Sequence, residues 1–311
     1  MKENDMVLGK GAKIKAWITA SRLRTLPLAF SSIFMGSFIA AYYGHMRWSV
    51  LGLATLTTLF LQVLSNLAND YGDSVHGADS DQRQGPQRVV QQGLISLPQM
   101  KRGMIICGLL SLLSGIALLY VSFGAQLELF LVFLLLGLFA IGAAVTYTAG
   151  VRPYGYMGLG DISVFLFFGP VGVLGVYFLH SGNLAPGIWL PAAALGFFSA
   201  GVLNVNNIRD IESDREAGKY SIPVRLGRKK AVVYHALLLL AGWAAILVYS
   251  MSIIDKKSVW IILLMLPLFL KNFWAVKNRT HPSDLDPFLK QLAISTFLFV
   301  LVYGFGLLVP F

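Results

Sequence analysis

The run ELFLVFLLLGLFAIGAAVTYTA at residues 128–149 decides the fold, because in 22 residues it carries one charge, Glu128, at its edge. A helix of about 20 apolar residues is long enough to span the hydrocarbon core of a bilayer. Runs of comparable apolarity recur along the chain and predict nine membrane-spanning helices. We place them at residues 25–44, 49–71, 102–123, 128–149, 161–181, 187–208, 231–251, 258–275 and 288–309. The chain is therefore expected to be an all-α, polytopic membrane protein.

The overall composition agrees with that expectation and excludes several classes of protein. Of the 311 residues, 56% are hydrophobic and 13% are charged, whereas a soluble domain carries about 25% charged residues. The net charge of +10 does not indicate nucleic-acid binding, because the cations are scattered between apolar runs. The single cysteine, Cys107, excludes an internal disulfide and a multi-cysteine metal site, and the five histidines are too dispersed for a zinc site.

The distribution of charge orients the predicted helices. With the N-terminus in the cytoplasm, all but three of the 25 Lys and Arg residues lie on the cytoplasmic side, the exceptions being Arg47, Lys256 and Lys257. This asymmetry follows the positive-inside rule and predicts a multi-pass protein of the cell inner (cytoplasmic) membrane. We expect one integral-membrane domain over residues 1–311. Its cytoplasmic parts would be an amphipathic segment at 1–24 and two long cap loops at 72–101 and 209–230, where function should reside.

Two clusters of acidic and amide side chains lie at the cytoplasmic ends of predicted helices. The helix at 49–71 leads into Asn-Leu-Ala-Asn-Asp-Tyr-Gly-Asp at residues 66–73, and helical spacing places its polar side chains in one arc. The members of this arc are Asn66, Asn69, Asp70 and Asp73. The helix at 187–208 leads into a second cluster, whose members are Asn206, Asp210 and Asp214. Both clusters contain the pattern N-x-x-x-D, and we predict that they face one another.

Carboxylates in this position need positive partners. A charge at the centre of a spanning helix costs about 2.5 to 3.5 kcal/mol, and less near the interface. Oxygen ligands of this kind suit Mg²⁺, which takes one or two carboxylates and completes its shell with water and phosphate oxygens. Two facing clusters would hold a diphosphate through metal ions, while nearby cations bind the remaining phosphate oxygens. The candidate cations are Arg88, Arg152, Arg209, Arg215 and Lys219.

Other interpretations of the acidic residues stay open. The clusters could be solvated helix ends, although matched spacing in two clusters disfavours this. They could belong to a proton or cation pathway, but such residues usually lie nearer the middle of a helix. Asp161, which opens the predicted helix at 161–181, is interpreted as a helix cap.

Several segments taken together resemble the UbiA superfamily of intramembrane prenyltransferases. The paired signature of that family is similar to Asn-Asp-Tyr-Gly-Asp at residues 69–73 and to Asp-x-x-x-Asp at residues 210–214. The segments at 17–28 (WITASRLRTLPL), 85–88 (GPQR) and 206–210 (NNIRD) resemble the branch that prenylates 1,4-dihydroxy-2-naphthoate in menaquinone synthesis. The resemblance extends over about residues 15–309.

This resemblance implies a nine-helix bundle around a central cavity open to the cytoplasmic side. It implies an Mg²⁺-dependent enzyme in which an all-trans polyprenyl diphosphate ionises and its prenyl group is transferred to 1,4-dihydroxy-2-naphthoate, with loss of CO₂, to give demethylmenaquinone. The alternative acceptors are 4-hydroxybenzoate and haem or chlorophyll precursors. A cation-coupled membrane transporter is the alternative outside the enzymes.

The resemblance also implies roles for individual residues. The carboxylates expected to be catalytic are Asp73, Asp210 and Asp214. The expected Mg²⁺ ligands are Asn69, Asp73 and Asp79 on one side and Asp210 and Asp214 on the other. The expected diphosphate-binding residues are Arg88, Arg152, Arg209 and Lys219. The chain departs from the family pattern N-D-x-x-D-x-x-x-D at Gly77, for which Asp79 is the best substitute. It departs again around Arg152, where the related branch often has a Gly-Pro-Tyr-like turn.

Overall fold

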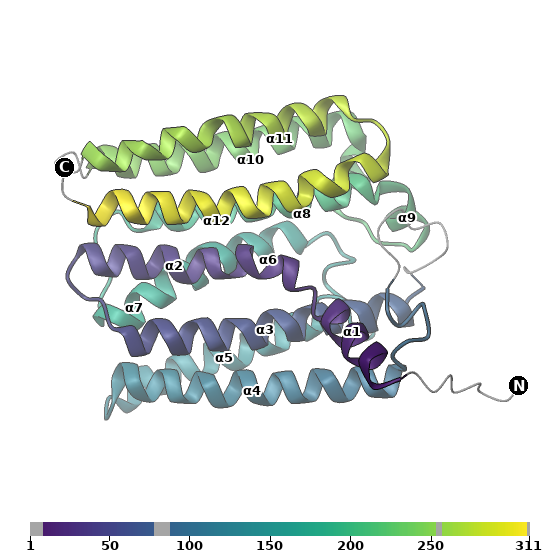
Figure 1. Ribbon diagram of the computed structural model, residues 1–311, viewed down its shortest axis with the longest axis horizontal. Helices are drawn as coiled ribbons and strands as arrows, with labels where there is room; N and C mark the ends of the chain where they lie inside the picture. Colours follow the sequence, from purple (N-terminus) through teal and green to yellow (C-terminus); the bar gives the residue numbers. More distant parts are fainter. Residues whose placement is uncertain (1–8, 78–87, 253–256, 310–311) are drawn as a thin grey trace, which may run out of the picture.

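The chain folds into a bundle of helices, most of which run side by side along the long axis of the molecule (Figure 1). The computed structural model describes residues 9–77, 88–252 and 257–309, and within these ranges every regular element is helical. The long helices are α2 (Leu26–Tyr42), α3 (Trp48–Val75), α4 (Leu97–Phe123), α5 (Leu127–Thr146), α8 (Trp189–Arg209), α10 (Ile222–Ser252), α11 (Leu266–Asn278) and α12 (Asp286–Leu308). The all-α prediction is therefore confirmed.

Eight helical stretches in the described part of the chain are long and apolar enough to cross a membrane, whereas nine were predicted. The remaining prediction, at 187–208, corresponds to α8, which has the required length. Its asparagines at 204, 206 and 207 lower its mean hydropathy, and fifteen of its residues are buried. The polar residues of α8 thus face protein rather than lipid, and the chain is a multi-span membrane protein.

An aromatic core fixes α8 against the last three long helices. The Phe198 ring of α8 packs 4.7 Å from Phe269 of α11 and 5.3 Å from Phe299 of α12, and Trp243 of α10 lies 5.4 Å from Phe269, centroid to centroid. Tilted and edge-to-face contacts of this kind stabilise a core beyond the area they bury. Gly242 of α10 lies directly under Phe198, where a Cβ atom would come within 2.4 Å of the ring. This close packing positions the end of α8, where the second acidic cluster begins.

The predicted helix at 161–181 contains an interruption. It consists of α6 (Gly160–Leu166), a π-helical stretch η2 (Phe167–Leu174) and α7 (Gly175–Ser181). Pro170 lies inside η2, where it cannot donate a backbone hydrogen bond, and the Ser32 hydroxyl of α2 donates to the carbonyl of Phe168 at 2.6 Å. The cap interpretation of Asp161 was wrong. The N-cap of α6 is Leu159, and buried Asp161 instead accepts a hydrogen bond from Tyr234 of α10 at 3.2 Å.

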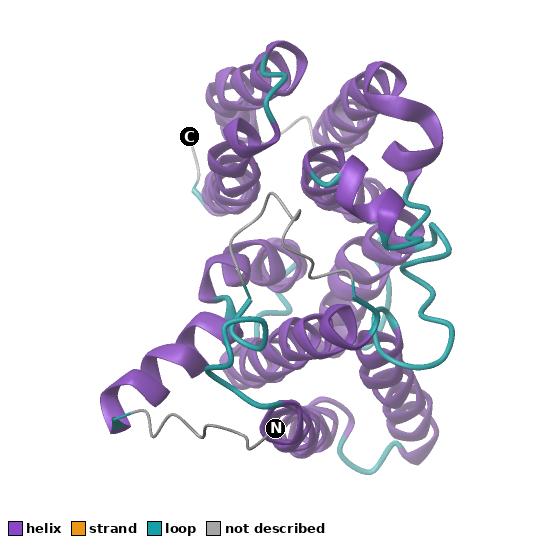
Figure 2. Ribbon diagram, turned by 90° about the vertical axis from the view of Figure 1, so that its right-hand side faces the viewer, coloured by secondary structure: helices purple, strands orange, loops and turns teal. Residues whose placement is uncertain are grey.

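Two short helices and several connections gather at one end of the bundle, which faces the viewer in Figure 2. Helix α1 (Lys10–Ser21) packs there through Trp17, whose ring would lie 2.7 Å from a Cβ atom placed on Gly103 of α4. Helix α9 (Ile211–Glu216) follows α8. The two predicted cap loops are shorter than expected, because α3 continues to Val75 and α4 begins at Leu97, while α9 and the start of α10 occupy much of 209–230.

Candidate active site

The first acidic cluster lies in the last turns of α3, as the sequence predicted. Asp73 is buried, and its Oδ2 atom accepts a hydrogen bond from Arg88 Nη2 at 2.6 Å. Its Oδ1 atom accepts a hydrogen bond from the Tyr156 hydroxyl at 2.9 Å. Gly72 allows this approach, since a Cβ atom there would lie 2.3 Å from the carbonyl oxygen of Thr148. The close packing of α3 against the turn after α5 therefore sets the position of the Asp73 carboxylate.

Asp70 holds two arginines together beside Asp73. Its Oδ1 atom accepts hydrogen bonds from Arg88 and from Arg22, which lies between α1 and α2 in the left-handed backbone conformation. A non-glycine residue in that conformation is uncommon and indicates a local constraint. Arg88 thus contacts both carboxylates, and Arg22 ties the start of the chain to the same cluster.

The second cluster begins where α8 ends. Arg209 and Asp210 are both buried, and the guanidinium donates to both oxygens of the Asp210 carboxylate, from Nε at 2.8 Å and from Nη2 at 2.7 Å. Asn206 Nδ2 donates to Asp210 Oδ2 at 3.4 Å. Arg209 also pairs with Asp286, which lies in the first turn of α12. Arg209 therefore links the cluster to the neighbouring helix.

Asp214 and Lys219 connect the two clusters. Asp214 lies in α9, and its Oδ1 atom accepts a hydrogen bond from Lys219 Nζ at 3.1 Å. Burial raises the pKa of Asp214 to about 6, Lys219 opposes the rise, and the charges of Asp210 and Asp73 add to it. Burial alone would lower the pKa of Lys219, but Asp214 and Asp73 raise it overall. The backbone N–H of Tyr220, which follows Lys219, donates to the carbonyl of Tyr156 at 2.9 Å, and the Tyr156 hydroxyl donates to Asp73, so the segment that carries Lys219 lies beside the first cluster.

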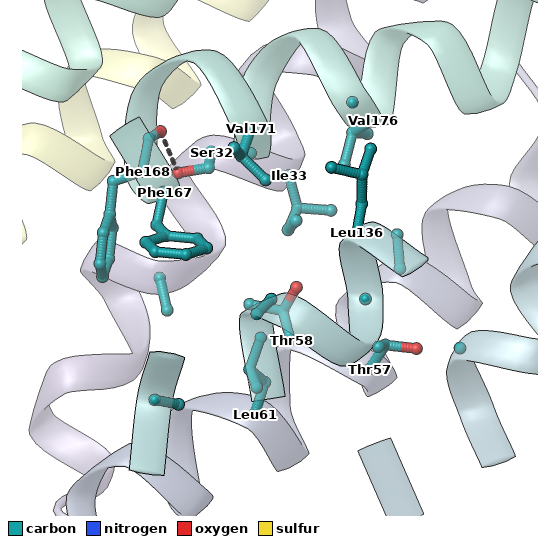
Figure 3. A pocket seen from close by; sticks show the side chains of 18 of the residues that line it. Ser32, Ile33, Thr57, Thr58, Leu61, Leu136, Phe167, Phe168, Val171 and Val176 are labelled. Carbon is teal, nitrogen blue, oxygen red and sulfur yellow. Dashed lines mark hydrogen bonds between the residues drawn. The ribbon is translucent and has the colours of Figure 1, made fainter. Parts of the chain in front are cut away.

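Asn69 borders an apolar cavity of about 700 Å³ that extends along the bundle. The Thr148 hydroxyl donates to Asn69 Oδ1 at 2.9 Å. From that end the lining continues through apolar and small polar side chains, several of which point into the cavity in Figure 3. They include Ser32, Ile33, Thr57, Thr58, Leu61, Leu136, Phe167, Phe168, Val171 and Val176. No carboxylate among the described residues lines this cavity, so an uncharged chain suits it.

Tyr147 lies where the cavity meets the charged clusters. It lines the cavity together with Tyr154, and the two rings form an edge-to-face pair with centroids 5.3 Å apart. Burial raises the pKa of the Tyr147 phenol, and Lys219 opposes that rise. The phenol therefore lies within electrostatic range of the Lys219 ammonium. A molecule with an anionic head and an apolar tail could place its head at Lys219 and its tail past Tyr147.

The oxygen donors of the two clusters decide which cation they can hold. Among the described residues, no three His, Cys, Asp or Glu side chains lie close enough together to form a metal site. Mg²⁺ does not need three carboxylates, because water and phosphate oxygens usually complete its shell. In the described part of the chain the Oδ2 atom of Asp214 is buried and has no hydrogen-bond partner. This oxygen offers a free ligand position, and the residues present therefore fit a hard cation bound together with phosphate.

The structure brings together most of the predicted site residues. The exceptions are Arg152 and a residue of which the structure gives no description. Asp79 lies outside the described residues, and Arg152 is exposed in the turn after α5. Arg215, the other candidate cation, pairs with Glu212 on the surface of α9. Among the predicted cations, buried Arg88 and Arg209 and the mostly buried Lys219 contact the carboxylates directly.

Sequence reasoning missed several contributors to the site, among them Arg22, which pairs with Asp70. Tyr147 directly follows α5, and Tyr156 lies in the turn that contains Arg152. In sequence, neither residue differs from the other aromatic residues of the chain. Asp286 contributes from a distant helix, and its position at the start of an apolar run is equally typical of a helix-dipole carboxylate. A search for polar residues flanking every apolar run would have included Asp286.

The sequence matches known proteins over almost its entire length. The profile of the UbiA prenyltransferase family matches residues 29–304. A 1,4-dihydroxy-2-naphthoate octaprenyltransferase from Haemophilus influenzae is 42% identical, over 96% of this chain and 97% of the relative. The enzyme of the same name from Escherichia coli is 43% identical, over 95% of this chain and 96% of the relative.

Solved structures share the fold. A UbiA homolog from Aeropyrum pernix superposes with a TM-score of 0.69 at 18% identity, covering 92% of this chain and 97% of that one. A UbiA homolog from Archaeoglobus fulgidus, solved bound to GPP and Mg²⁺, superposes with a TM-score of 0.62 at 19% identity, covering 92% and 99%. At such identities the likeness concerns the fold, and it confirms the predicted type of bundle.

Proposed function

The chain belongs to the UbiA prenyltransferase family, and from that premise we propose that it transfers a polyprenyl group to 1,4-dihydroxy-2-naphthoate in menaquinone synthesis. The donor is an all-trans polyprenyl diphosphate. The observation that carries this proposal is that Asp73 and Asp214, buried carboxylates that pair with Arg88 and Lys219, lie near an apolar cavity that the cluster residue Asn69 lines. The acceptor follows from the two relatives with that activity, which are 42% and 43% identical over nearly full length.

The proposed reaction needs no protein nucleophile. The bond between C1 of the prenyl chain and the diphosphate oxygen breaks, and the diphosphate leaves with the electron pair. The electron-rich naphthoate ring attacks the allylic cation, and a carbon–carbon bond forms. The ring carboxylate leaves as CO₂, and its bonding pair stays in the ring. Because no oxidant is consumed, the first product is demethylmenaquinol, the reduced form of demethylmenaquinone.

Mg²⁺ is the proposed cofactor. Two solved structures of a UbiA homolog from Archaeoglobus fulgidus are bound to GPP and Mg²⁺ and to DMAPP and Mg²⁺, and the oxygen donors of this chain suit the same ion. When bound, the ion would neutralise the diphosphate and stabilise it as a leaving group. The residues that would hold it are Asn69 and Asp73, together with Asp79, from the first cluster and Asp210 and Asp214 from the second.

The protein's own cations and rings act on the two ends of the substrate. Arg88 and Arg209 reach the carboxylates as planar guanidinium groups, which also match the geometry of phosphate oxygens. Lys219 supplies a further positive charge between the clusters. Tyr147 and Tyr154 line the cavity, and with the reacting carbon C1 beside them their rings would stabilise the allylic cation and exclude water that would otherwise quench it.

We place the acidic site on the cytoplasmic side of the inner membrane. The reason is the asymmetry in Lys and Arg residues between the two ends of the bundle. Arg47 precedes α3 at the end opposite the first cluster, and Lys257 begins the helical stretch that leads into α11. A long isoprenoid chain is as apolar as lipid and is best kept in the bilayer. Its diphosphate head would meet the wet, charged end of the bundle.

A transporter is disfavoured by where the charges lie. Transporters keep their ion sites near the middle of the membrane, at broken helices. Here the interrupted stretch η2 contributes Phe167, Phe168 and Val171 to an apolar wall, and the carboxylates of the candidate site lie at the ends of α3 and α8. The aromatic acceptor is thus the part of the proposal that most needs a direct test.

Purified protein incubated with Mg²⁺, farnesyl diphosphate and one aromatic acid at a time provides that test. We expect prenylated product and CO₂ with 1,4-dihydroxy-2-naphthoate, and no product from 4-hydroxybenzoate. Asp210→Ala, assayed in parallel, should form none. Transfer to 4-hydroxybenzoate without release of CO₂ would show that the chain is a prenyltransferase with a different aromatic acceptor. A lack of transfer to every acceptor by folded protein would refute the proposal.

A further inference from the structure

A lysine lies on the outward face of a membrane-spanning helix, away from the active site. Lys271 belongs to the candidate span Trp260–Asn278 and is exposed. It lies seven residues before the end of α11, about 10 Å along the helix axis. Its neighbours on the same face are apolar and exposed, with Leu270 at 48% and Trp274 at 52%. The ammonium group therefore leaves the helix on its lipid-facing side.

Lys271 and Lys277, which lies six residues further along α11, form no ion pair with any described residue of the chain. The acidic residues at this end of α12 are engaged elsewhere, since Asp284 lies 4.0 Å from Arg279 and Asp286 pairs with Arg209. A charge within a span is costly unless it reaches the interface or meets an opposite charge. The long Lys271 side chain can reach the interface, and none of the acidic residues in the described ranges pairs with it.

The surrounding residues extend the positive charge toward the end of the helix. Lys277 Nζ lies 4.8 Å from the centre of the Trp274 ring, and tryptophan favours the headgroup level of a bilayer. Arg228 of α10 donates to the carbonyls of Val276 and Arg279, which adds a guanidinium at the same helix end. Lys271, Trp274 and Lys277 form what we call the α11 basic face.

We propose that the α11 basic face binds the phosphodiester headgroup of an anionic phospholipid. The two ammonium groups hold the phosphate, and the acyl chains lie along the exposed Leu270 and Trp274 side chains. The ligand must be amphipathic, because the cations rise directly from an apolar, lipid-facing surface. The site is separate from the acidic clusters of α3, α8 and α9, so it stands independently of the proposed prenyl transfer.

Native mass spectrometry of the full chain in detergent tests the proposal. Dioleoylphosphatidylglycerol and dioleoylphosphatidylcholine are added separately at equal concentrations, and the bound fraction gives an apparent dissociation constant. Wild-type protein should retain phosphatidylglycerol in preference to phosphatidylcholine. Lys271→Gln should weaken phosphatidylglycerol binding about fivefold, and the double change with Lys277→Gln about 25-fold. Phosphatidylcholine binding should not change.

Lys101→Gln is the matched control, because Lys101 is an exposed cation near the same end of the bundle, on α4. Equal weakening by the control would indicate diffuse charge attraction and overturn the site. Displacement of the lipid by millimolar glycerol phosphate would indicate a site for soluble phosphate instead. Dimers that dissociate on Lys271→Gln would indicate an interface between copies of the chain. Unchanged lipid affinity in the double variant would also refute the proposal.

Discussion

Lys219 Nζ lies 3.1 Å from one oxygen of Asp214, and the other oxygen of that carboxylate is buried with no hydrogen-bond partner in the described part of the chain. One side of the carboxylate is thus neutralised by the protein, and the other side remains for a ligand. Asp73 and Asp210 also act on the charge of Lys219. The lysine is therefore the cation shared by both acidic clusters, and it is the natural counter-charge for a diphosphate between them.

Lys219→Met should weaken catalysis mainly through the diphosphate. We expect kcat/KM for farnesyl diphosphate to fall about 100-fold, with a rise in KM, because a charge-assisted contact to the phosphate oxygens is lost. Steady-state kinetics at saturating acceptor measure this. Lys230→Met, at an exposed lysine of α10, should behave as wild type. A threefold effect or less for Lys219→Met would show that the lysine does not contact the substrate.

Removal of either facing carboxylate should abolish turnover in folded protein. For Asp73→Ala and Asp210→Ala we expect losses of at least about a thousandfold in kcat, since each carboxylate is assigned to the ion that stabilises the leaving group. The elution volume in size-exclusion chromatography should stay unchanged. Asp284→Ala is the control, because that carboxylate is half exposed and pairs only loosely with Arg279. Near-normal activity in either site variant would refute the metal assignment at that residue.

Acidification should weaken Mg²⁺ binding. Burial raises the pKa of Asp214 to about 6, so the carboxylate is almost fully ionised at pH 7.5 and mostly protonated at pH 5.5. Protons and the cation compete for the same oxygens, and the half-saturating Mg²⁺ concentration should rise about fourfold across that range. Activity assays over a Mg²⁺ series at each pH measure it, and EDTA should abolish activity at both. A constant half-saturating concentration would mean that Asp214 is not a ligand.

Much of the fold was accessible to sequence reasoning because the bilayer restricts the possibilities. Apolar runs had to be helices, and helical spacing placed Asn69 and Asp73 on one arc. Hydropathy could not predict that α8 is buried among other helices, because a buried helix with polar residues and a weakly apolar membrane-spanning helix have similar composition. It also could not predict the π-helical stretch, for which Pro170 indicates a disturbance of the helix but not its form.

The partners of the acidic residues were harder to predict. Tyr156 is 83 positions from Asp73, and Arg209 is 77 positions from Asp286. Contacts at such separations depend on which helices pack together, and no local pattern encodes that choice. A cation close to a cluster in sequence is easier to assign as its partner, since Lys219 lies five residues beyond Asp214 and donates to it. Arg152 shows the limit of this reasoning, because its side chain is exposed away from the buried cations.

Gly72→Ala should disturb both stability and the site. A Cβ atom there would lie 2.3 Å from the backbone carbonyl oxygen of Thr148, so α3 must move. We expect a loss of about 2 kcal/mol in unfolding free energy and a clear loss of activity through displaced Asp73. Gly52→Ala in the same helix has open space and should stabilise by about 1 kcal/mol. Thermal unfolding in detergent compares them. Equal stability of the two variants would contradict the close approach of α3.

The cavity should set which prenyl chains are accepted. Leu136 of α5 points into it, whereas neighbouring Leu135 is 65% exposed and does not line it. Leu136→Trp should therefore leave turnover of geranyl diphosphate within about twofold while lowering kcat/KM for a long polyprenyl diphosphate at least tenfold, because about one isoprene unit of space is filled. Leu135→Trp should change neither substrate. If Leu136→Trp affected both diphosphates equally, the tail would have to lie outside this cavity, and the assignment of the apolar space to the prenyl chain would fail.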